Sequence, residues 1–265
     1  MMNITRIAAA ALVALALPVS AMAAVGESIV EDIAFSFEGP LGAYEPAQLQ
    51  RGLQVYNEVC AACHGMKFVS FRSLGEPGGP SYGEAQVKAL AALYEVADKD
   101  GEPGDMRTAI PADNFPANNG AGAPDLSMMA KARAGFHGPF GLGINQLING
   151  TGGPEYIYSV LTGYTGEESE VAGNVLYGNH TMAGGWIKMG PPLSDDLIEY
   201  ADGTKASPEQ MAEDVSAFLM WAAEPKMSER KAAGTRNFVF IAVLAVLLYL
   251  SNKKLWSTVK NKKAA

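Results

Sequence analysis

The segment Cys60-Ala61-Ala62-Cys63-His64 contains both cysteines of this 265-residue chain. Two cysteines separated by two residues and followed at once by a histidine form the C-x-x-C-H pattern, which is typical of covalent haem c attachment. On a helix, residues three and four positions apart share a face, so both sulfurs can reach two vinyl groups at one haem edge while the imidazole reaches the iron. The pattern predicts that Cys60 and Cys63 hold one haem c and that His64 is an axial iron ligand.

A helix is expected to carry this motif. Pro46 stands where the first helical residue would be, and apolar residues recur at helical spacing from Leu49 to Tyr56, so we expect a helix from Pro46 to Ala62. A redox dithiol is the competing interpretation of the two cysteines. It does not account for the histidine, and such dithiols usually lie in a βαβ setting, which the sequence does not suggest.

An electron carrier is expected to have a second axial ligand. A methionine in that position raises the reduction potential because its thioether favours ferrous iron. Met189 is a candidate, since Pro191-Pro192 restricts the backbone just after it and would hold the sulfur in place. Met182 competes with it, and a second histidine, His137 or His180, is a further alternative. The residues alone leave this choice open.

The N-terminus has the pattern of a secretory signal. Arg6 supplies positive charge, Ile7 to Leu17 is apolar, and Ala21-Met22-Ala23 has the A-x-A form of a cleavage site. The apolar run is too short to span a bilayer easily. We therefore expect residues 1–23 to be a signal peptide and residues 24–231 to form an exported, periplasmic haem domain.

The C-terminus has the pattern of a membrane anchor. Phe238 to Leu250 is an uncharged apolar run of thirteen residues, and its flanks extend it toward the roughly 20 residues that span a bilayer. Trp256 can lie at the interface, and five lysines follow the run, which favours a cytoplasmic end. We expect residues 232–256 to be a single transmembrane helix in a bacterial inner membrane, and residues 257–265 to be a cytoplasmic tail.

Charge is distributed unevenly along the chain. All 28 acidic residues lie between Ala24 and Thr235, so the expected exported domain has 13 bases against 28 acids, a net charge of −15. Such an acidic domain disfavours a nucleic-acid partner and favours a basic protein partner, whose association it would accelerate at low salt. Glu167, Glu168 and Glu170 form the densest acidic cluster, and we expect it to steer a basic electron acceptor.

Several segments together resemble the cytochrome c1 family, the haem c subunits of cytochrome bc1 complexes. They are Cys60 to His64, Met189-Gly190-Pro191-Pro192-Leu193, the terminal anchor, Arg51 to Tyr56, Asn118 to Ala121, Pro124 to Ser127, Leu161 to Tyr164, Tyr200 to Thr204 and Trp221 to Pro225. As a set these segments are more specific than C-x-x-C-H alone, and they extend over most of the chain. The resemblance implies a mainly α, cytochrome c-like haem domain with long loops, plus one C-terminal transmembrane helix.

The resemblance also implies residue roles. Met189 is implied as the sixth iron ligand, Arg133 as the partner of a haem propionate, and Tyr156 as an aromatic side chain near the haem. Some members of the family carry an additional cysteine pair that this chain lacks, so we expect packing to hold the loop before Met189. Residues 135–153 resemble a glycine-rich insertion of bacterial members.

The implied partners are cytochrome b and the Rieske iron–sulfur protein as complex subunits, with cytochrome c as the electron acceptor. The implied function is to pass single electrons from the Rieske protein to cytochrome c within ubiquinol–cytochrome c oxidoreductase, without independent catalysis. Two alternatives are a monohaem c subunit of a terminal oxidase and a haem peroxidase or sensor with a labile sixth ligand.

Further helices and loops are expected from periodicity, capping residues and glycine and proline content. The helices are Gly83–Val96, Asp125–Arg133, Glu155–Thr162 and Pro208–Ala223, and the loops are Gly75–Ser81 and Gly101–Pro124.

Overall fold

The computed structural model describes residues 29–98, 100–120, 122–135 and 150–263. The expected signal peptide, His137 and most of the 135–153 insertion therefore lie outside the described residues. The chain divides into two compact units. The smaller unit comprises residues 1–29 and 163–191, and the larger unit comprises residues 30–162 and 192–265.

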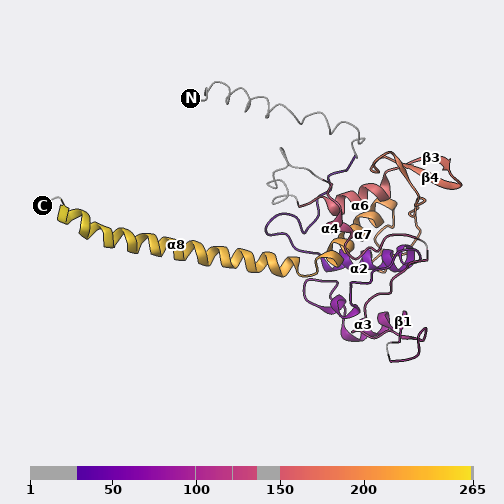
Figure 1. Cartoon of the computed structure of the whole chain (residues 1–265), viewed down its shortest axis with the longest axis horizontal. Coiled ribbons are helices and arrows are strands. Elements are labelled where there is room, and N and C mark those ends of the chain that lie inside the picture. The colour runs from indigo at the N-terminus through magenta and orange to yellow at the C-terminus, as the bar shows by residue number, and fades with distance from the viewer. Residues whose placement is uncertain (1–28, 99, 121, 136–149, 264–265) are drawn as a thin grey trace, which may run out of the picture. The chain divides into compact units, whose positions relative to one another are not determined.

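The larger unit is mainly helical, as the sequence predicts. Its helices are α2 (Pro46–Val55), α3 (Glu84–Ala91), α4 (Met129–Ala132), α6 (Gly153–Thr162), α7 (Pro208–Ala223) and α8 (Met227–Lys263) (Figure 1). Helix α7 lies at the centre and packs against α2, α4 and α6. It begins as expected, because Pro208 occupies the first turn and the Ser207 hydroxyl accepts a hydrogen bond from the amide of Gln210.

The helix that leads to the two cysteines differs from the expectation. Regular α-helix ends at Val55, and residues Tyr56–Cys60 form a wider π-helical turn in which the amide of Ala61 donates to Tyr56 O at 2.8 Å. The prediction of α-helix as far as Ala62 is therefore wrong beyond Val55. Cys63 lies in the turn after the π segment and His64 directly follows that turn, so the motif does not lie on one regular α-helix.

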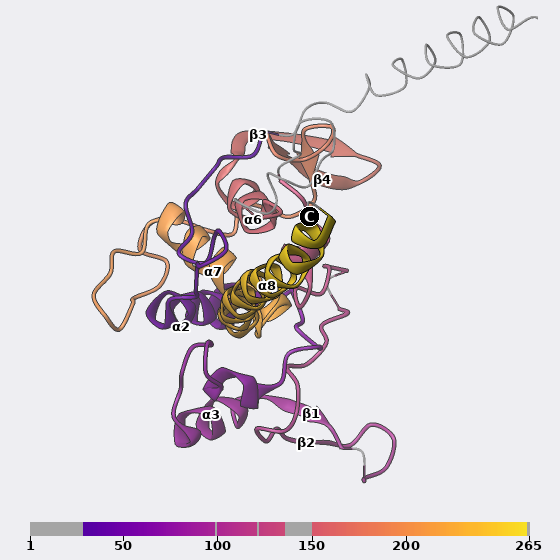
Figure 2. The same ribbon diagram turned by 90° about the vertical axis from the view of Figure 1, so that its left-hand side faces the viewer.

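Two other predicted helices are shorter than expected. Helix α3 ends at Ala91, and the chain then turns into strand β1 (Glu95–Ala97), which pairs antiparallel with β2 (Met106–Thr108) (Figure 2). The segment from Asp125 does not start a helix, because the Asp125 carboxylate accepts hydrogen bonds from the amides of Lys67 and Ser127, both at 3.0 Å. A 3-10 helix at Phe71–Gly75 was also not predicted.

The smaller unit contains a three-stranded antiparallel sheet that the sequence did not predict. Strand β3 (Tyr164–Val171) pairs with β4 (Asn174–Asn179), which pairs with β5 (Trp186–Ile187). The register places Glu168 opposite Tyr177 and Glu170 opposite Val175. The acidic cluster of the sequence therefore lies on an exposed β-hairpin.

The core of the larger unit is aromatic. Phe115 contacts the rings of Phe71 and Tyr56, with ring centroids 4.2 Å and 5.8 Å apart, and Phe218 of α7 continues the cluster to Trp221. All five side chains are buried. This cluster joins the end of α2, the middle of α7 and the chain segment around residue 115.

Helices α2 and α7 cross with almost no space between their backbones. A methyl group at Gly52 would lie 2.1 Å from Asp214 O and 2.6 Å from Cβ of Phe218. Beside this contact, Arg51 makes a two-pronged ion pair with the fully buried Asp214, at 3.0 Å for both nitrogen–oxygen pairs, and also reaches Asp202. Burying Asp214 is tolerable because its charge is paired and hydrogen bonded.

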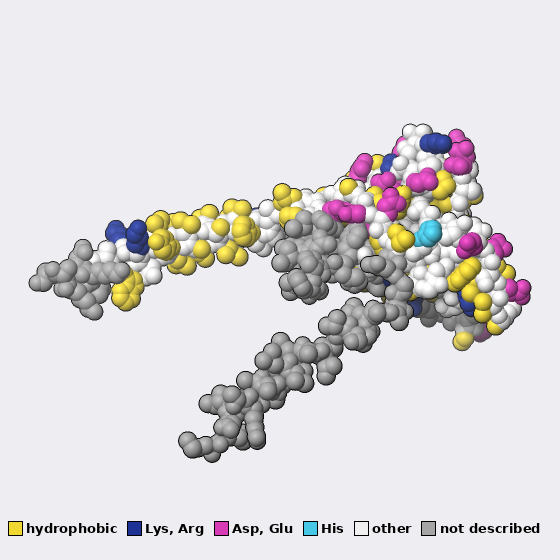
Figure 3. Space-filling view, turned by 90° about the horizontal axis from the view of Figure 1, so that it is seen from above, with side chains coloured by type: hydrophobic (Ala, Val, Ile, Leu, Met, Phe, Trp, Pro, Cys, Tyr) yellow, Lys and Arg dark blue, Asp and Glu magenta, His cyan; other side chains and the backbone are white. Residues whose placement is uncertain are grey.

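Helix α8 follows α7 after three residues and matches the expected anchor. Its run Phe238–Leu250 is exposed throughout, and Figure 3 shows apolar side chains covering the helix up to the lysines near its end. The first turn of α8 is bound to the domain. The Tyr44 hydroxyl donates to Met220 O at 3.1 Å and lies 3.2 Å from Glu224 O, while the Tyr44 amide donates to the Ser228 hydroxyl.

Replacing Gly52 by alanine is expected to destabilise the larger unit. The added methyl group would meet backbone atoms of α7, which cannot move without separating the two helices. We expect the free energy of unfolding to fall by about 1–3 kcal/mol, the usual cost of overpacking. Thermal unfolding of the full chain in detergent, followed by circular dichroism, measures this loss.

Gly234→Ala is the matched control, because Gly234 is also helical and nothing lies within 4 Å of the position that its added methyl group would take. It should leave the unfolding temperature unchanged or raise it slightly. An equal loss of stability in both variants would contradict the close-contact explanation.

Candidate haem-binding site

The two cysteines and the histidine of the motif lie together at the end of the π-helical turn. The amides of Cys63 and His64 both donate to Cys60 O, at 3.1 Å and 2.9 Å. Both thiols are free, with Cys60 half-buried and Cys63 exposed. The structure thus brings all three predicted residues into one short loop, and leaves both sulfurs available for covalent attachment.

The imidazole of His64 has a fixed orientation. Its Nδ1 atom lies 2.7 Å from the carbonyl oxygen of Pro124, sixty residues along the chain. A carbonyl oxygen only accepts, so Nδ1 carries a proton, and in the neutral imidazole the free lone pair is then on Nε2. A neutral imidazole that donates through one nitrogen to a carbonyl is the arrangement that presents the other nitrogen to a metal.

The segment that carries Pro124 is held against the motif by several backbone contacts. A methyl group at Gly65 would lie 2.4 Å from the amide nitrogen of Asn118, so the two backbones touch there. The Asn118 side-chain amide donates to Ala62 O at 2.9 Å, and the amide of Leu126 donates to Gly65 O at 2.9 Å. These contacts, made by residues before and after Pro124 in the sequence, hold the Pro124 carbonyl in position.

A hydroxyl on the opposite side also supports the histidine. Tyr56 is buried in the aromatic cluster, and its hydroxyl donates to His64 O at 3.2 Å. Burial raises the pKa of Tyr56 well above its usual range, so the hydroxyl keeps its proton and remains a donor.

The Cys60 thiol lacks the lowered pKa that is typical of a catalytic dithiol. Burial raises the pKa of the Cys60 thiol to about 12, with Cys63 adding to the shift. Catalytic dithiols depend on a thiolate that is stabilised at neutral pH, which requires a lowered pKa. The environment of Cys60 therefore disfavours the dithiol interpretation.

The residues present fit a covalently held haem. They supply two unpaired sulfurs and an oriented imidazole with a free Nε2, which is the donor set that haem c attachment requires. No group of three or more histidine, cysteine, aspartate or glutamate side chains capable of holding a metal ion occurs within the described ranges.

Met189 lies in the smaller unit, in a segment held by hydrogen bonds. The Tyr164 hydroxyl donates to Met189 O at 2.9 Å and approaches Gly190 O at 3.3 Å. Burial raises the pKa of Tyr164 to about 12, so it stays a donor at neutral pH. The loop before Met189 is held by β4–β5 pairing and by a hydrogen bond of 2.8 Å from the amide of Asn179 to Gly185 O. The sequence analysis expected packing to hold this loop, and these backbone hydrogen bonds also hold it.

For the other predicted site residues, the described contacts include none with Cys60, Cys63 or His64. Arg133 is exposed at the end of α4, and its guanidinium has no ion-pair partner among the described residues. Tyr156 is half-buried on α6. The competing ligand candidates Met182 and His180 both belong to the smaller unit, like Met189.

Three supporting groups were missed by the sequence analysis, namely the Pro124 carbonyl, the Tyr56 hydroxyl and the Asn118 amide. Asn118 and Pro124 lie in segments that had been noted for their family resemblance alone. Every residue type has a backbone carbonyl, so the sequence could not indicate that the carbonyl of Pro124 accepts a hydrogen bond from His64.

Comparison with known proteins gives consistent results. The Cytochrome C1 family model matches residues 35–259. The chain is 55% identical to cytochrome c1 of Cereibacter sphaeroides, over 98% of both proteins. It is 38% identical to a mitochondrial cytochrome c1 haem protein of Kluyveromyces lactis, over 86% of this chain and 77% of that protein. It is also 42% identical to cytochrome b/c1 of Bradyrhizobium diazoefficiens, over 84% of this chain and 35% of that protein.

Replacing Gly65 by alanine is expected to disturb the orientation of His64. The methyl group would overlap the backbone of residues 116–118 and push this loop away from the motif. We expect a loss of about 1–3 kcal/mol in stability, together with a changed visible spectrum of the haem-loaded protein. Thermal unfolding and absorption spectroscopy measure the two effects.

Gly120→Ala serves as the control, since its methyl group would lie 3.7 Å from the nearest atom, Oδ1 of Asn118. It should match the wild type in both measurements. Wild-type stability and spectrum in the Gly65 variant would show that the loop does not set the orientation of the ring.

Proposed function

Since the chain belongs to the cytochrome c1 family, we propose that it passes single electrons from a Rieske iron–sulfur protein to a cytochrome c within ubiquinol–cytochrome c oxidoreductase. As a family member it is a subunit of a cytochrome bc1 complex, with one covalently bound haem c, and it serves electron transport in the respiratory chain. The observation that carries the proposal is the His64 imidazole, held by Pro124 O at 2.7 Å beside two free thiols.

The residues of the motif have distinct roles in this proposal. Cys60 and Cys63 would hold the haem through thioether bonds, and His64 would bind the iron through Nε2. The bound haem supplies a one-electron couple. The hydrogen bond to Pro124 O would hold the imidazole in one orientation, which would limit rearrangement around the iron when its charge changes.

Met189 is the proposed sixth ligand. Two observations support this choice, beside the family resemblance that favours it over Met182. The backbone of Met189 and Gly190 is bound by Tyr164 on one side and followed by Pro191-Pro192 on the other. A methionine held in this way would keep the sixth position closed, which fits a carrier and disfavours a peroxidase or sensor that needs a labile ligand.

Arg133 and Tyr156 are proposed to lie near the haem. The Arg133 guanidinium has no ion-pair partner among the described side chains, so it is free to pair with a propionate carboxylate. Tyr156 presents a half-buried ring on the first turns of α6. Both assignments rest on the family resemblance together with these positions.

The partners are proposed from the relatives and from charge. One similar protein carries the name cytochrome b/c1, which supports cytochrome b as a neighbouring subunit. The acidic composition of the haem domain favours a basic electron acceptor, as expected for a cytochrome c.

The proposed placement follows from the two ends of the chain. Residues 1–23 would be removed as a signal peptide, and residues 24–231 would form the periplasmic haem domain. Helix α8 would cross the inner membrane over residues 232–256, with residues 257–265 in the cytoplasm. The apolar, exposed surface of α8 and the lysines after it support this orientation.

Met189→Leu is expected to lower the reduction potential by some hundreds of millivolts. Loss of the thioether removes a ligand that favours ferrous iron, and a one-electron couple shifts by about 59 mV for each tenfold change in relative stability. An optical titration of the haem against electrode potential measures the change.

Met182→Leu is the matched control and should retain the wild-type potential. If instead Met182→Leu lowers the potential and Met189→Leu does not, the ligand assignment is reversed. An unchanged high potential in both variants would place the sixth ligand elsewhere.

Charge reversal on the β3–β4 hairpin is expected to slow reduction of a basic cytochrome c. Glu168 and Glu170 are two residues apart on the exposed strand β3, so their side chains point to the same face of the hairpin. The double variant Glu168→Lys/Glu170→Lys should lower the second-order rate by about tenfold at low ionic strength and flatten its salt dependence.

A second double variant, Glu84→Lys/Glu95→Lys, changes the net charge equally at exposed positions on α3 and β1. Stopped-flow kinetics should show a much smaller effect for it. Equal effects in the two variants would mean that only net charge matters and that the hairpin is not the docking surface.

A further inference from the structure

A groove lies where α8 leaves the haem domain. It has a volume of about 780 Å³ and is formed by the chain around Phe37, the start of α6, the end of α7 and the first three turns of α8. Its lining is mainly apolar and includes Met220, Met227 and Phe238. Phe238 is also the first residue of the exposed apolar run of α8, so the groove opens directly onto the surface that faces lipid in an anchored protein.

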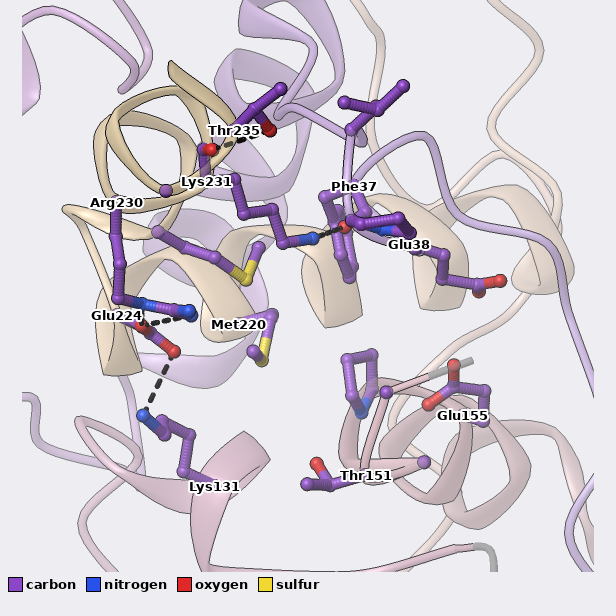
Figure 4. A pocket seen from close by; sticks show the side chains of 18 of the residues that line it. Phe37, Glu38, Lys131, Thr151, Glu155, Met220, Glu224, Arg230, Lys231 and Thr235 are labelled. Atoms are coloured by element: carbon purple, nitrogen blue, oxygen red, sulfur yellow. Dashed lines mark hydrogen bonds and ion pairs between the residues drawn. The ribbon is translucent and has the colours of Figure 1, made fainter. Parts of the chain in front are cut away.

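One end of the groove carries two carboxyl groups. Glu155, on the first turn of α6, is 1% exposed, and its Oε2 atom has no hydrogen-bond partner among the described residues. Figure 4 shows Glu38 on the same side of the groove as Glu155. Burial, together with the nearby Glu38 and Asp32 carboxylates, raises the pKa of Glu155 to about 7. A buried carboxyl oxygen without a partner is costly, and a cationic ligand that donates to Oε2 would satisfy it.

The opposite side of the groove carries cations. Lys131 and Arg230 flank Glu224, with nitrogen–oxygen distances of 2.9 Å and 2.6 Å (Figure 4). Arg230 uses Nε and Nη2 on this carboxylate and retains further N–H groups on its exposed side chain. Lys231 reaches between the two sides and donates to Phe37 O.

The charges of the lining are balanced, and Glu224 among them is already paired with Lys131 and Arg230. Three basic side chains, Lys131, Arg230 and Lys231, stand against three acidic ones, Glu38, Glu155 and Glu224. An anionic lipid would meet the two carboxyl groups at one end, and a purely cationic ligand would meet the bases at the other. A zwitterion with a phosphate and a separate ammonium matches both ends.

We propose that this groove binds a phospholipid with a primary ammonium headgroup, of the phosphatidylethanolamine class. The ammonium donates to Glu155 and Glu38, the phosphate accepts from Arg230 and Lys231, and an acyl chain passes Met227 and Phe238 into the membrane. A trimethylated choline headgroup has no N–H group, so it cannot satisfy the carboxyl oxygens. The proposal depends on α8 lying in a membrane and is independent of the route of the electrons.

Lipid affinity measured by native mass spectrometry tests the proposal. The haem-loaded full chain, in detergent, is titrated with phosphatidylethanolamine and with phosphatidylcholine of the same acyl chains. We expect the wild type to bind phosphatidylethanolamine about tenfold more tightly. Glu155→Gln and Glu38→Gln should each weaken that preference, while Glu84→Gln, on the exposed face of α3, should retain it. Equal affinity for the two lipids in the wild type would overturn the proposal, as would a full preference in Glu155→Gln.

Photocrosslinking in the intact complex separates a lipid from a protein occupant. Phosphatidylethanolamine with a photoreactive group near its glycerol should label residues 37–41 or 227–238. Absence of this label, with crosslinks from the same residues to another subunit, would show that a protein covers the groove and would overturn the proposal. A wild-type reduction potential in Glu155→Gln, beside its lost lipid preference, would show that the two functions are separate.

Discussion

The hydrogen bond from His64 Nδ1 to the Pro124 carbonyl is the interaction on which the site depends. Without it, the imidazole could rotate and exchange tautomers, and the nitrogen offered to the iron would not be defined. The bond is possible because Gly65 lets the chain near Asn118 approach within backbone contact, and because Asn118 and Leu126 bind the motif from both sides. The orientation of the histidine in this five-residue motif therefore depends on a loop more than fifty residues away in the sequence.

The same loop depends on the helices beneath it. Tyr56 links the motif to the aromatic cluster, and this cluster includes Phe218 of α7. Helix α7 is in turn fixed to α2 by the close approach at Gly52 and by the Arg51–Asp214 ion pair. The packing of the core therefore helps to hold the motif and the His64 backbone in place through a few direct contacts.

The sequence predicted those features whose causes are local. Helix α7 has its predicted bounds because Ser207 and Pro208 start it within one turn, and the anchor follows from a run of apolar residues. The π-helical turn at Tyr56 was missed because its packing partners Phe115 and Phe218 are distant in sequence. The hairpin β3–β4 was missed although its strands are only two residues apart, because the composition of β3 is not typical of a strand. Strand β3 is rich in glutamate, which disfavours strands, and it forms through its register with β4. The choice of Met189 over Met182 came from the family resemblance, since local rigidity alone could not separate them.

The three-residue junction between α7 and α8 has a mechanical consequence. Tyr44 bonds to residues on both sides of this junction, so the haem domain and the first turn of the anchor are braced together. The first turn of α8 is therefore not a free tether, and a tilt of this turn would be passed to the end of α7 through Tyr44.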